Sequence, residues 1–407
     1  MNPNLTLTPM VKVIINRQTV KHIKCAILAV FAAALVLSCA GVTENQTEVG
    51  GQPVTAEMVL NSSPLAEDIT NQDVAQVDLL ALSPEMTAFL DKHVDRDGKQ
   101  TEKLAQLVYA IIGEDRFVLA YDDSTRTAQS TFQDRRGNCI SFTNMFVAMA
   151  RDLELDASYQ EVTIPPDWSM AGQTFLFSEH VNALVGMNNA LSRVVDFNTY
   201  NIGVPEDSRE ISDQRARAHY FNNIGVEHML AGETNLAYAN FRESLREDRS
   251  FSSSWVNLGV LHRREAYPGY AEAAYLEALE YDRSSLMAMS NLANLYTEEG
   301  RTELAEHYLA KVKLHRMSNP FYRYELANAA FAEGDYKTAI KNLKYAIRKR
   351  KDQDQFYFLL SLSYLMSGEK ETAQRWMEKA EEVALQSASK QKYHHKLDLL
   401  MGRNTGI

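Results

Sequence analysis

The chain has 407 residues, of which 45% are hydrophobic and 23% are charged, so it is long enough for two or three domains with ordinary apolar cores. This composition excludes an intrinsically disordered chain, a collagen and a small scaffold held together by disulfides. The formal net charge of −11 argues against binding to nucleic acid, and it predicts that the protein surface as a whole repels anionic lipid headgroups.

Residues 1–38 have the pattern of a secretory signal peptide. Two lysines precede an apolar run of about a dozen residues, which is shorter than a bilayer span requires. The run ends in the letters VLSC at 36–39, which resemble the lipobox of bacterial lipoproteins. That resemblance implies cleavage before Cys39, a lipid on its sulfur and, because Ala40 follows, attachment to the periplasmic face of the outer membrane of a bacterial envelope. A plain signal peptide with a fortuitous cysteine is the alternative interpretation.

Residues 39–76 are predicted to form a flexible tether between this anchor and a folded body. They are mostly polar, contain Gly50, Gly51 and Pro53, and show no sustained hydrophobic period.

Residues 77–205 have the pattern of an α+β domain. Apolar residues recur at spacings of three and four over 83–94 and 101–112, where Ser83 and Thr101 are expected as helix N-caps. A further helical stripe begins at Cys139. Three short apolar runs predict strands at 159–164, 180–186 and 193–197.

Cys139 is the predicted nucleophile of this domain. Cys25 would leave with the signal peptide and Cys39 would carry lipid, so Cys139 would be the single free thiol. A helix N-terminus and a neighbouring imidazolium both favour the thiolate form. His180 is the predicted base and Asp196 the group that orients its ring, because adjacent strands can hold the two side by side. The alternative interpretation is that Cys139 is a buried core thiol without a chemical role.

This arrangement resembles the transglutaminase-like fold, which is related to papain. The resemblance rests on the following residues of the first element: Gly137, Asn138, Cys139, Phe142, Phe146, Ala148, Arg151 and Leu153. It implies a Cys-His-Asp triad, and papain-like enzymes carry an oxyanion-stabilising glutamine at the spacing of Gln133. The chain departs from the family in having no tryptophan after His180 and no proline after Asp196, which leaves the reaction open.

A repeat array follows a charged linker predicted at 206–216. Five units over 217–386 keep a period of 34 residues without insertion. The period is carried by alanines at 237, 271, 305, 339 and 373 and by apolar residues at 224, 258, 292, 326 and 360. The units resemble tetratricopeptide repeats, so an all-α solenoid is expected, closed by a capping helix and tail at 387–407.

Two classes of function fit these patterns. The first is a membrane-anchored periplasmic cysteine hydrolase or acyltransferase that acts on peptide or amide bonds, with peptide cleavage favoured over cross-linking. The solenoid would recruit a protein or peptide, with Asn223, Asn257 and Asn291 bonding to its backbone. The second is a non-catalytic adaptor that assembles envelope proteins, which includes a housekeeping lipoprotein with a degenerate first domain. No metal-ligand spacing and no cofactor motif is present, so neither a metal nor a cofactor is expected.

Overall fold

The computed structural model describes residues 12–16, 48–49, 52–66, 74, 77–112, 117–163, 179–187, 191–197, 207–384, 393 and 396. These residues form two compact units, one ending at Ala305 and the other beginning at Glu306. The predicted signal peptide lies outside the described residues except for 12–16, and the lipidation site Cys39 also lies outside them. Within the described part, no helix is both long and apolar enough to span a bilayer.

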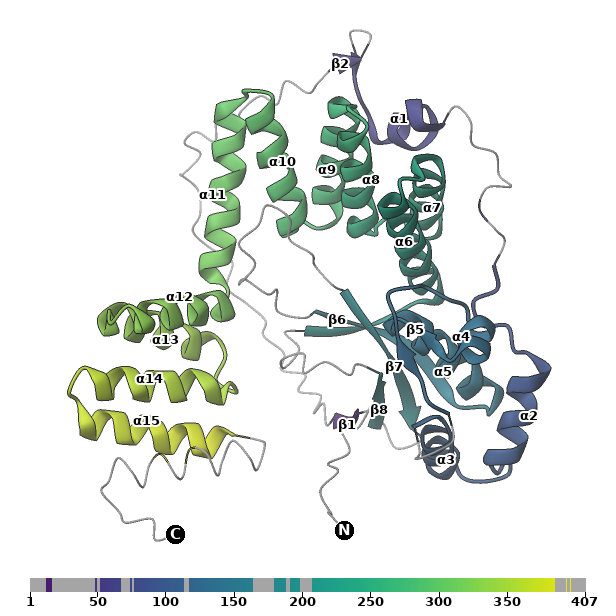
Figure 1. Ribbon diagram of the computed structural model, residues 1–407, viewed down its shortest axis with the longest axis horizontal. Coiled ribbons are helices and arrows are strands. Elements are labelled where there is room, and N and C mark those ends of the chain that lie inside the picture. The colour runs from purple at the N-terminus through teal and green to yellow at the C-terminus, as the bar shows by residue number, and fades with distance from the viewer. Residues whose placement is uncertain are drawn as a thin grey trace, which may run out of the picture. The chain divides into compact units, whose positions relative to one another are not determined.

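The first unit contains a five-stranded antiparallel sheet (Figure 1). Its order is β1 (Lys12–Asn16), β8 (Leu191–Asp196), β7 (Glu179–Met187), β6 (Asp156–Thr163) and β9 (Asp207–Ile211). The three predicted strands are confirmed as β6, β7 and β8. Two shorter pairs are β2 (Glu48–Val49) with β3 (Gln52–Pro53), and β4 (Ala120–Tyr121) with β5 (Arg136–Gly137).

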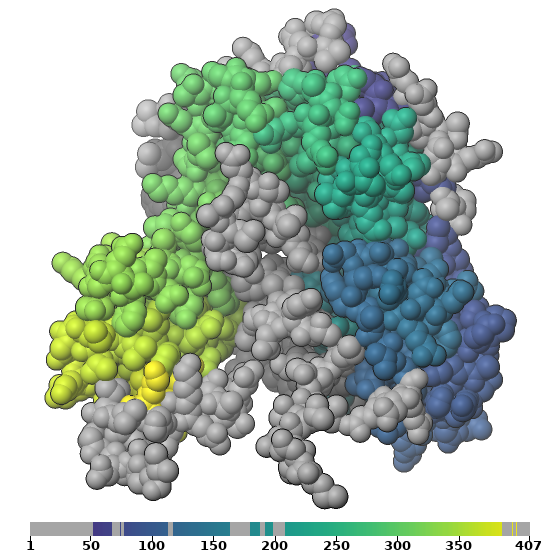
Figure 2. Space-filling view, in the orientation of Figure 1, coloured from purple at the N-terminus to yellow at the C-terminus, as the bar shows by residue number. Residues whose placement is uncertain are grey.

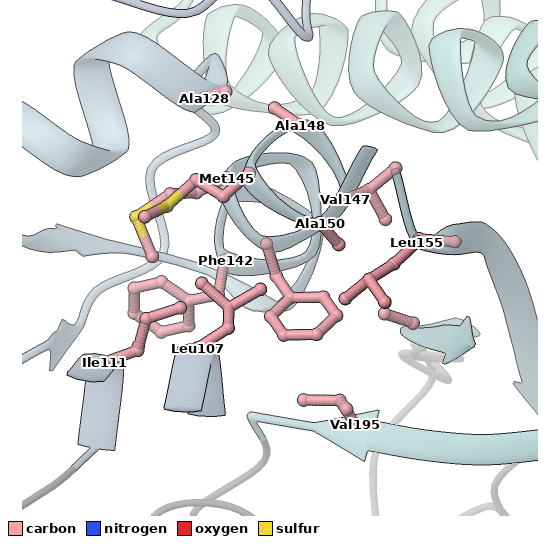
Figure 3. Packing of buried hydrophobic residues seen from close by; sticks show 14 of the residues in the cluster. Leu107, Ile111, Ala128, Phe142, Met145, Val147, Ala148, Ala150, Leu155 and Val195 are labelled. Atoms are coloured by element: carbon pink, nitrogen blue, oxygen red, sulfur yellow. The ribbon is translucent and has the colours of Figure 1, made fainter. Parts of the chain in front are cut away.

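Helix α5 is the centre of the core beside this sheet. It runs from Cys139 to Asp152, and every residue from Ile140 to Ala150 is buried. A helix that is buried all round is held by its neighbours on every side. Figure 3 shows Phe142 of α5 beside Leu107 and Ile111 of helix α3 (Gln100–Ile112), with Val195 on the strand that faces them. The start of α5, and therefore Cys139, has a fixed position relative to the sheet.

The other helices of this domain are α2 (Pro84–His93), α3 (Gln100–Ile112) and α4 (Ala128–Asp134). The predicted cap of the first is confirmed, because the Ser83 side chain accepts a hydrogen bond from the Met86 backbone N–H. The predicted cap at Thr101 is wrong, because α3 already begins at Gln100 and Thr101 therefore lies inside its first turn.

The prediction of a structureless tether over 39–76 is wrong for residues 52–66, which we call the strap. The strap contains helix α1 (Ala56–Asn61) and the short 3-10 helix η1 (Pro64–Ala66). The Tyr238 hydroxyl lies 2.8 Å from the carbonyl oxygens of both Val59 and Leu60, and Val59 is completely buried. The segment is too short to show a hydrophobic period, but its few apolar side chains pack against the repeat helices.

The linker predicted at 206–216 is also folded. Strand β9 pairs with β6, and helix α6 begins at Asp213. The segment reads as a connector because it is rich in charge, but two of its charges, Arg209 and Arg215, bind the carboxylate of Glu161 on β6. A charged sequence here marks a salt-bridge network and not a solvated linker.

Ten successive helices, two in each 34-residue unit, confirm the repeats. They are α6 (Asp213–Ala231), α7 (Thr234–Glu247), α8 (Ser252–Arg264), α9 (Pro268–Tyr281), α10 (Leu286–Glu298), α11 (Thr302–Ser318), α12 (Pro320–Ala332), α13 (Tyr336–Lys349), α14 (Asp354–Met366) and α15 (Lys370–Val383). All five periodic alanines are buried. A Cβ on Gly259 would lie 2.5 Å from the ring of Tyr275, which shows how closely paired helices approach. The predicted capping helix lies outside the described residues except for Tyr393 and Lys396.

Candidate active site

Cys139 is the first residue of α5 and is only partly buried. Asn138 caps the helix, since its side-chain oxygen accepts a hydrogen bond from the Ser141 backbone N–H at 3.1 Å. The Asn138 amide nitrogen in turn donates to the Thr125 hydroxyl at 2.8 Å. The cap therefore ties the turn before the thiol to the loop that precedes α4.

Gly137 permits the sharp approach to α5. Its φ is +156°, and a Cβ added there would lie 2.5 Å from the Cβ of Ser141. No side chain fits in that space without moving the helix. The glycine two residues before the cysteine is therefore required by sterics, independently of any chemistry at the thiol.

His180 and Asp196 are joined by a short hydrogen bond. The His180 Nε2 atom lies 2.7 Å from the Asp196 Oδ1 atom, and the His180 side chain is only 3% exposed. Ala183 of β7 pairs with Val195 of β8, so the antiparallel register places Asp196 across from Asn182 and diagonal to His180. Side chains alternate along a strand, which puts all three polar residues on one face of the sheet.

The second ring nitrogen of His180 is available to the thiol. Nδ1 is buried and, among the described residues, forms no hydrogen bond. Burial opposes a charge on this imidazole, but the hydrogen bond to Asp196 and the electrostatic interactions with Asp196 and Cys139 outweigh that effect and raise the pKa of His180 to about 10. The raised pKa favours the imidazolium form of the ring, which is the form that stabilises a neighbouring thiolate.

Two further residues support this pair. Asn182 is buried and its amide nitrogen donates to the Asp196 Oδ2 atom at 3.3 Å, so both carboxylate oxygens are held. The Thr143 hydroxyl lies 2.9 Å from the Cys139 carbonyl oxygen and 3.1 Å from that of Val181, which ties α5 to β7 beside His180. Neither role is predicted from the sequence. The place of Asn182, two residues after His180 on the same strand face, is the feature that points to its role.

Gln133 lies in the last turn of α4 and its side chain is exposed. Within the described residues it forms no hydrogen bond to Cys139, His180 or Asp196, so its oxyanion role stays a prediction. Asn223, Asn257 and Asn291 lie on α6, α8 and α10 and are partly exposed, as a peptide-binding ladder needs. The Asn257 amide nitrogen already donates to the side-chain oxygen of Asn222 at 2.8 Å.

A buried charge cluster joins the five-stranded sheet to the first repeat. Glu161 of β6 accepts hydrogen bonds from Arg209 at 2.6 Å, from Arg215 at 2.7 Å and from His219 at 2.6 Å. Burial alone would raise the pKa of Glu161, but His219 and Arg215 hold it well below its usual range. Arg215 also binds Asp248 after α7.

A second link is a two-pronged ion pair between Arg151 of α5 and Asp213 of α6, at 2.7 and 2.8 Å. In Figure 2 the blue surface of the α4–α5 region is in contact with the teal surface of the first repeats. The sheet, α5 and the first repeat are therefore packed together as parts of one compact unit.

Within the part of the chain that the structure describes, no three or more histidine, cysteine, aspartate or glutamate side chains gather as a metal site would require.

Residues 87–187 match the family model of the transglutaminase-like superfamily. This range contains Cys139 and His180 and ends before Asp196. The protein thus combines a transglutaminase-like domain with tetratricopeptide-like repeats.

Solved structures similar to this chain are repeat proteins of low identity. MamA is 19% identical, with a TM-score of 0.24, and the alignment covers 44% of this chain and 95% of MamA. PilF of Pseudomonas aeruginosa is 17% identical, with a TM-score of 0.26 and coverage of 47% and 87%. YrrB, described as a TPR protein with an unusual peptide-binding site, is 16% identical, with a TM-score of 0.23 and coverage of 44% and 91%. No curated protein sequence matches the chain.

Proposed function

We propose that this protein is a cysteine hydrolase or acyltransferase that acts on peptide or amide bonds. The observation that carries the proposal is the position of His180, whose ring is bonded to Asp196 through Nε2 and interacts with the Cys139 thiol. A cysteine at a helix start, a buried histidine and an orienting carboxylate together are the groups that acyl transfer through a thioester requires.

The geometry supports the following reaction. The Cys139 thiolate attacks the carbonyl carbon of an amide, and a C–S bond forms as the carbonyl oxygen takes up negative charge. The His180 imidazolium then donates its proton to the departing amine, the C–N bond breaks, and a thioester remains. Water or a second amine attacks the thioester while His180 accepts its proton, and the C–S bond breaks. This releases the acid or the new amide and restores the Cys139 thiolate and the His180 imidazolium.

The N–H groups at the start of α5 support the charged oxygen in this scheme, because the first turn of a helix has free backbone donors. Gln133 is a second candidate donor. Asp196 remains ionised throughout and keeps the imidazole ring in place.

The repeats would recruit the protein or peptide substrate, with Asn223, Asn257 and Asn291 facing its backbone. The protein would be held at the bacterial envelope by a lipid on Cys39, on the periplasmic face of the outer membrane. The lipobox-like letters VLSC support this part of the proposal.

The test uses residues 40–407, in which Cys139 is the single cysteine. The alkylation rate of Cys139 is followed by mass spectrometry from about pH 4 to about pH 10, in the unmodified chain and in His180→Ala. An ordinary thiol reaches half of its maximal rate near about pH 8.5. We expect fast alkylation already at about pH 6 in the unmodified chain and a loss of that rate in His180→Ala.

The matched control is His228→Ala, which removes another histidine bonded to a carboxylate, that of Glu233 in the turn between α6 and α7. It should leave the alkylation profile unchanged. If Cys139 reacts like a free thiol with and without His180, the enzyme proposal is wrong and the adaptor interpretation takes its place.

A further inference from the structure

Helix α13 differs from the other second helices of the repeats in its charge. Residues 336–351 contain seven lysines and arginines and no aspartate or glutamate. The equivalent helix α9 carries only acids, at Glu272, Glu277 and Glu280, and α7 and α15 carry both signs. The repeat fold therefore does not require cations at this position.

The cations of α13 form one exposed row, which we call the cationic stripe. It consists of Lys337, Lys341, Lys344, Arg348 and Lys349. All five side chains are exposed, while Ala339, Leu343 and Ala346 on the opposite side of the helix are buried. At 1.5 Å per residue, the stripe is about 18 Å long.

The charge of the stripe is not neutralised by ion pairs. Within the described residues, none of its five side chains forms a salt bridge. The nearest acids in sequence lie at its two ends and have other roles: Asp335 caps the helix by accepting from the Thr338 N–H, and Asp352 pairs with Arg350. The charge is also regional, because residues 306–407 contain 18 lysines and arginines against 12 acids, although the whole chain has 42 against 53.

The surroundings of the stripe favour a flat anionic partner. The apolar side chains of α13 are used in the repeat core, so none remains to anchor a peptide. The ring of Tyr345 already lies next to Arg323, Arg348 and Lys349, at 4.6, 5.6 and 5.9 Å, so it is not open for stacking on a nucleic-acid base. Lysine is a point charge without the forked geometry by which arginine recognises single phosphates or carboxylates.

We propose that the cationic stripe docks this repeat unit on the anionic surface of a lipid bilayer. The net charge of −11 predicts repulsion from such a surface, but that average does not apply locally, because the acids that dominate it are absent from α13. A row of lysines on a rigid helix brings several charges within a Debye length of the headgroups at once. This proposal depends neither on catalysis at Cys139 nor on lipidation of Cys39.

The experiment is co-sedimentation of residues 40–407 with vesicles of phosphatidylglycerol and phosphatidylethanolamine, and with vesicles of phosphatidylcholine alone. The test variant is Lys337→Gln/Lys341→Gln/Lys344→Gln. The matched control is Lys370→Gln/Arg375→Gln/Lys379→Gln on α15, which changes the net charge equally but removes cations that alternate with acids. Circular dichroism of both variants verifies that these surface substitutions leave the fold intact.

We expect binding to the anionic vesicles only, weakened by salt, with about 100-fold lower affinity in the α13 variant and little change in the α15 variant. Equal losses in the two variants, equal binding to both kinds of vesicle, or no vesicle binding would overturn the proposal. Polyglutamate and duplex DNA are tested as competitors, and a tighter, stripe-dependent complex with either one would assign the surface to a protein or nucleic-acid partner instead.

Discussion

The carboxylate of Asp196 is held from both sides, by His180 Nε2 at 2.7 Å and by Asn182 Nδ2 at 3.3 Å. Both donors come from β7, two residues apart on one strand face, while the acceptor comes from β8. The imidazole orientation thus depends on an amide as well as on the acid, and the amide can be removed without touching the thiol, the ring or the carboxylate.

Substitution of Asn182 by alanine should lower the alkylation rate of Cys139 at about pH 6 by roughly tenfold, because a hydrogen bond to a charged group contributes about 1.5–3 kcal/mol. The reason is that Asp196 loses one of its donors and holds the imidazolium less firmly. The measurement is the pH profile of alkylation, whose midpoint should move to higher pH. Asn182→Ser, which keeps a donor, should recover part of the rate; an unchanged midpoint in Asn182→Ala would refute the positioning role.

Substitution of Gly137 by alanine should destabilise the first unit by about 1–3 kcal/mol, because the new methyl group overlaps Ser141 and the backbone conformation is unfavourable. Chemical denaturation followed by circular dichroism measures the change. Gly232→Ala is the control, since φ is +78° there but no atom lies within 4 Å of the added Cβ. A cost equal to that of the control would show that the contact with Ser141 is unimportant.

Replacement of Glu161 by glutamine should cost about 3–5 kcal/mol, because Arg215 and His219 lose the carboxylate that they surround. The pKa of Glu161 is depressed in the folded protein, so its contribution is present above the ordinary value of 4.5 and is lost as the pH falls below it. Thermal unfolding from about pH 7 to about pH 3 should therefore show a steeper loss of stability in the unmodified protein than in Glu161→Gln. Parallel curves would contradict this assignment.

Tyr238→Phe should loosen the strap, because the hydroxyl that bonds the Val59 and Leu60 carbonyls is lost. Leaving these buried carbonyls without a donor costs about 1–3 kcal/mol. Limited proteolysis measures the result as faster cleavage within residues 52–66. Tyr267→Phe, just before α9 in the next helix pair, serves as the control, and equal cleavage of both variants would argue against the contact.

The repeats and the sheet could be predicted from the sequence because their signals are periodic. The 34-residue step identifies helix pairs without reference to distant contacts, and β6, β7 and β8 alternate as strands do. The order of Cys139, His180 and Asp196 likewise followed from the elements on which they lie, and the structure brings His180 and Asp196 into contact.

What the sequence concealed are contacts between segments far apart in the chain. The strap packs on helices that lie about 180 residues later in the chain. The surrounding polar residues hide its four buried apolar residues, which are Val54, Val59, Leu60 and Leu65. The segment from Arg209 to Arg215 looked like a linker because nothing in its own letters indicates that Glu161 is buried opposite. The place of Asn182 on the strand can be seen in the sequence, but the sequence suggests only His180 as a partner of Asp196.

The strap covers one face of α7 and α9, where the hydroxyls of Tyr238 and Tyr270 donate to its carbonyl oxygens, and this changes how affinity for that face should be understood. A segment of the same chain already occupies that surface, and a tethered segment acts at an effective concentration in the millimolar range. Any partner for this face competes with a resident ligand and binds more weakly to the whole chain than to the bare surface. The strap thus acts as an intramolecular competitor that lowers the affinity of this surface for other ligands. Loosening the strap would increase that affinity without any change in the surface itself.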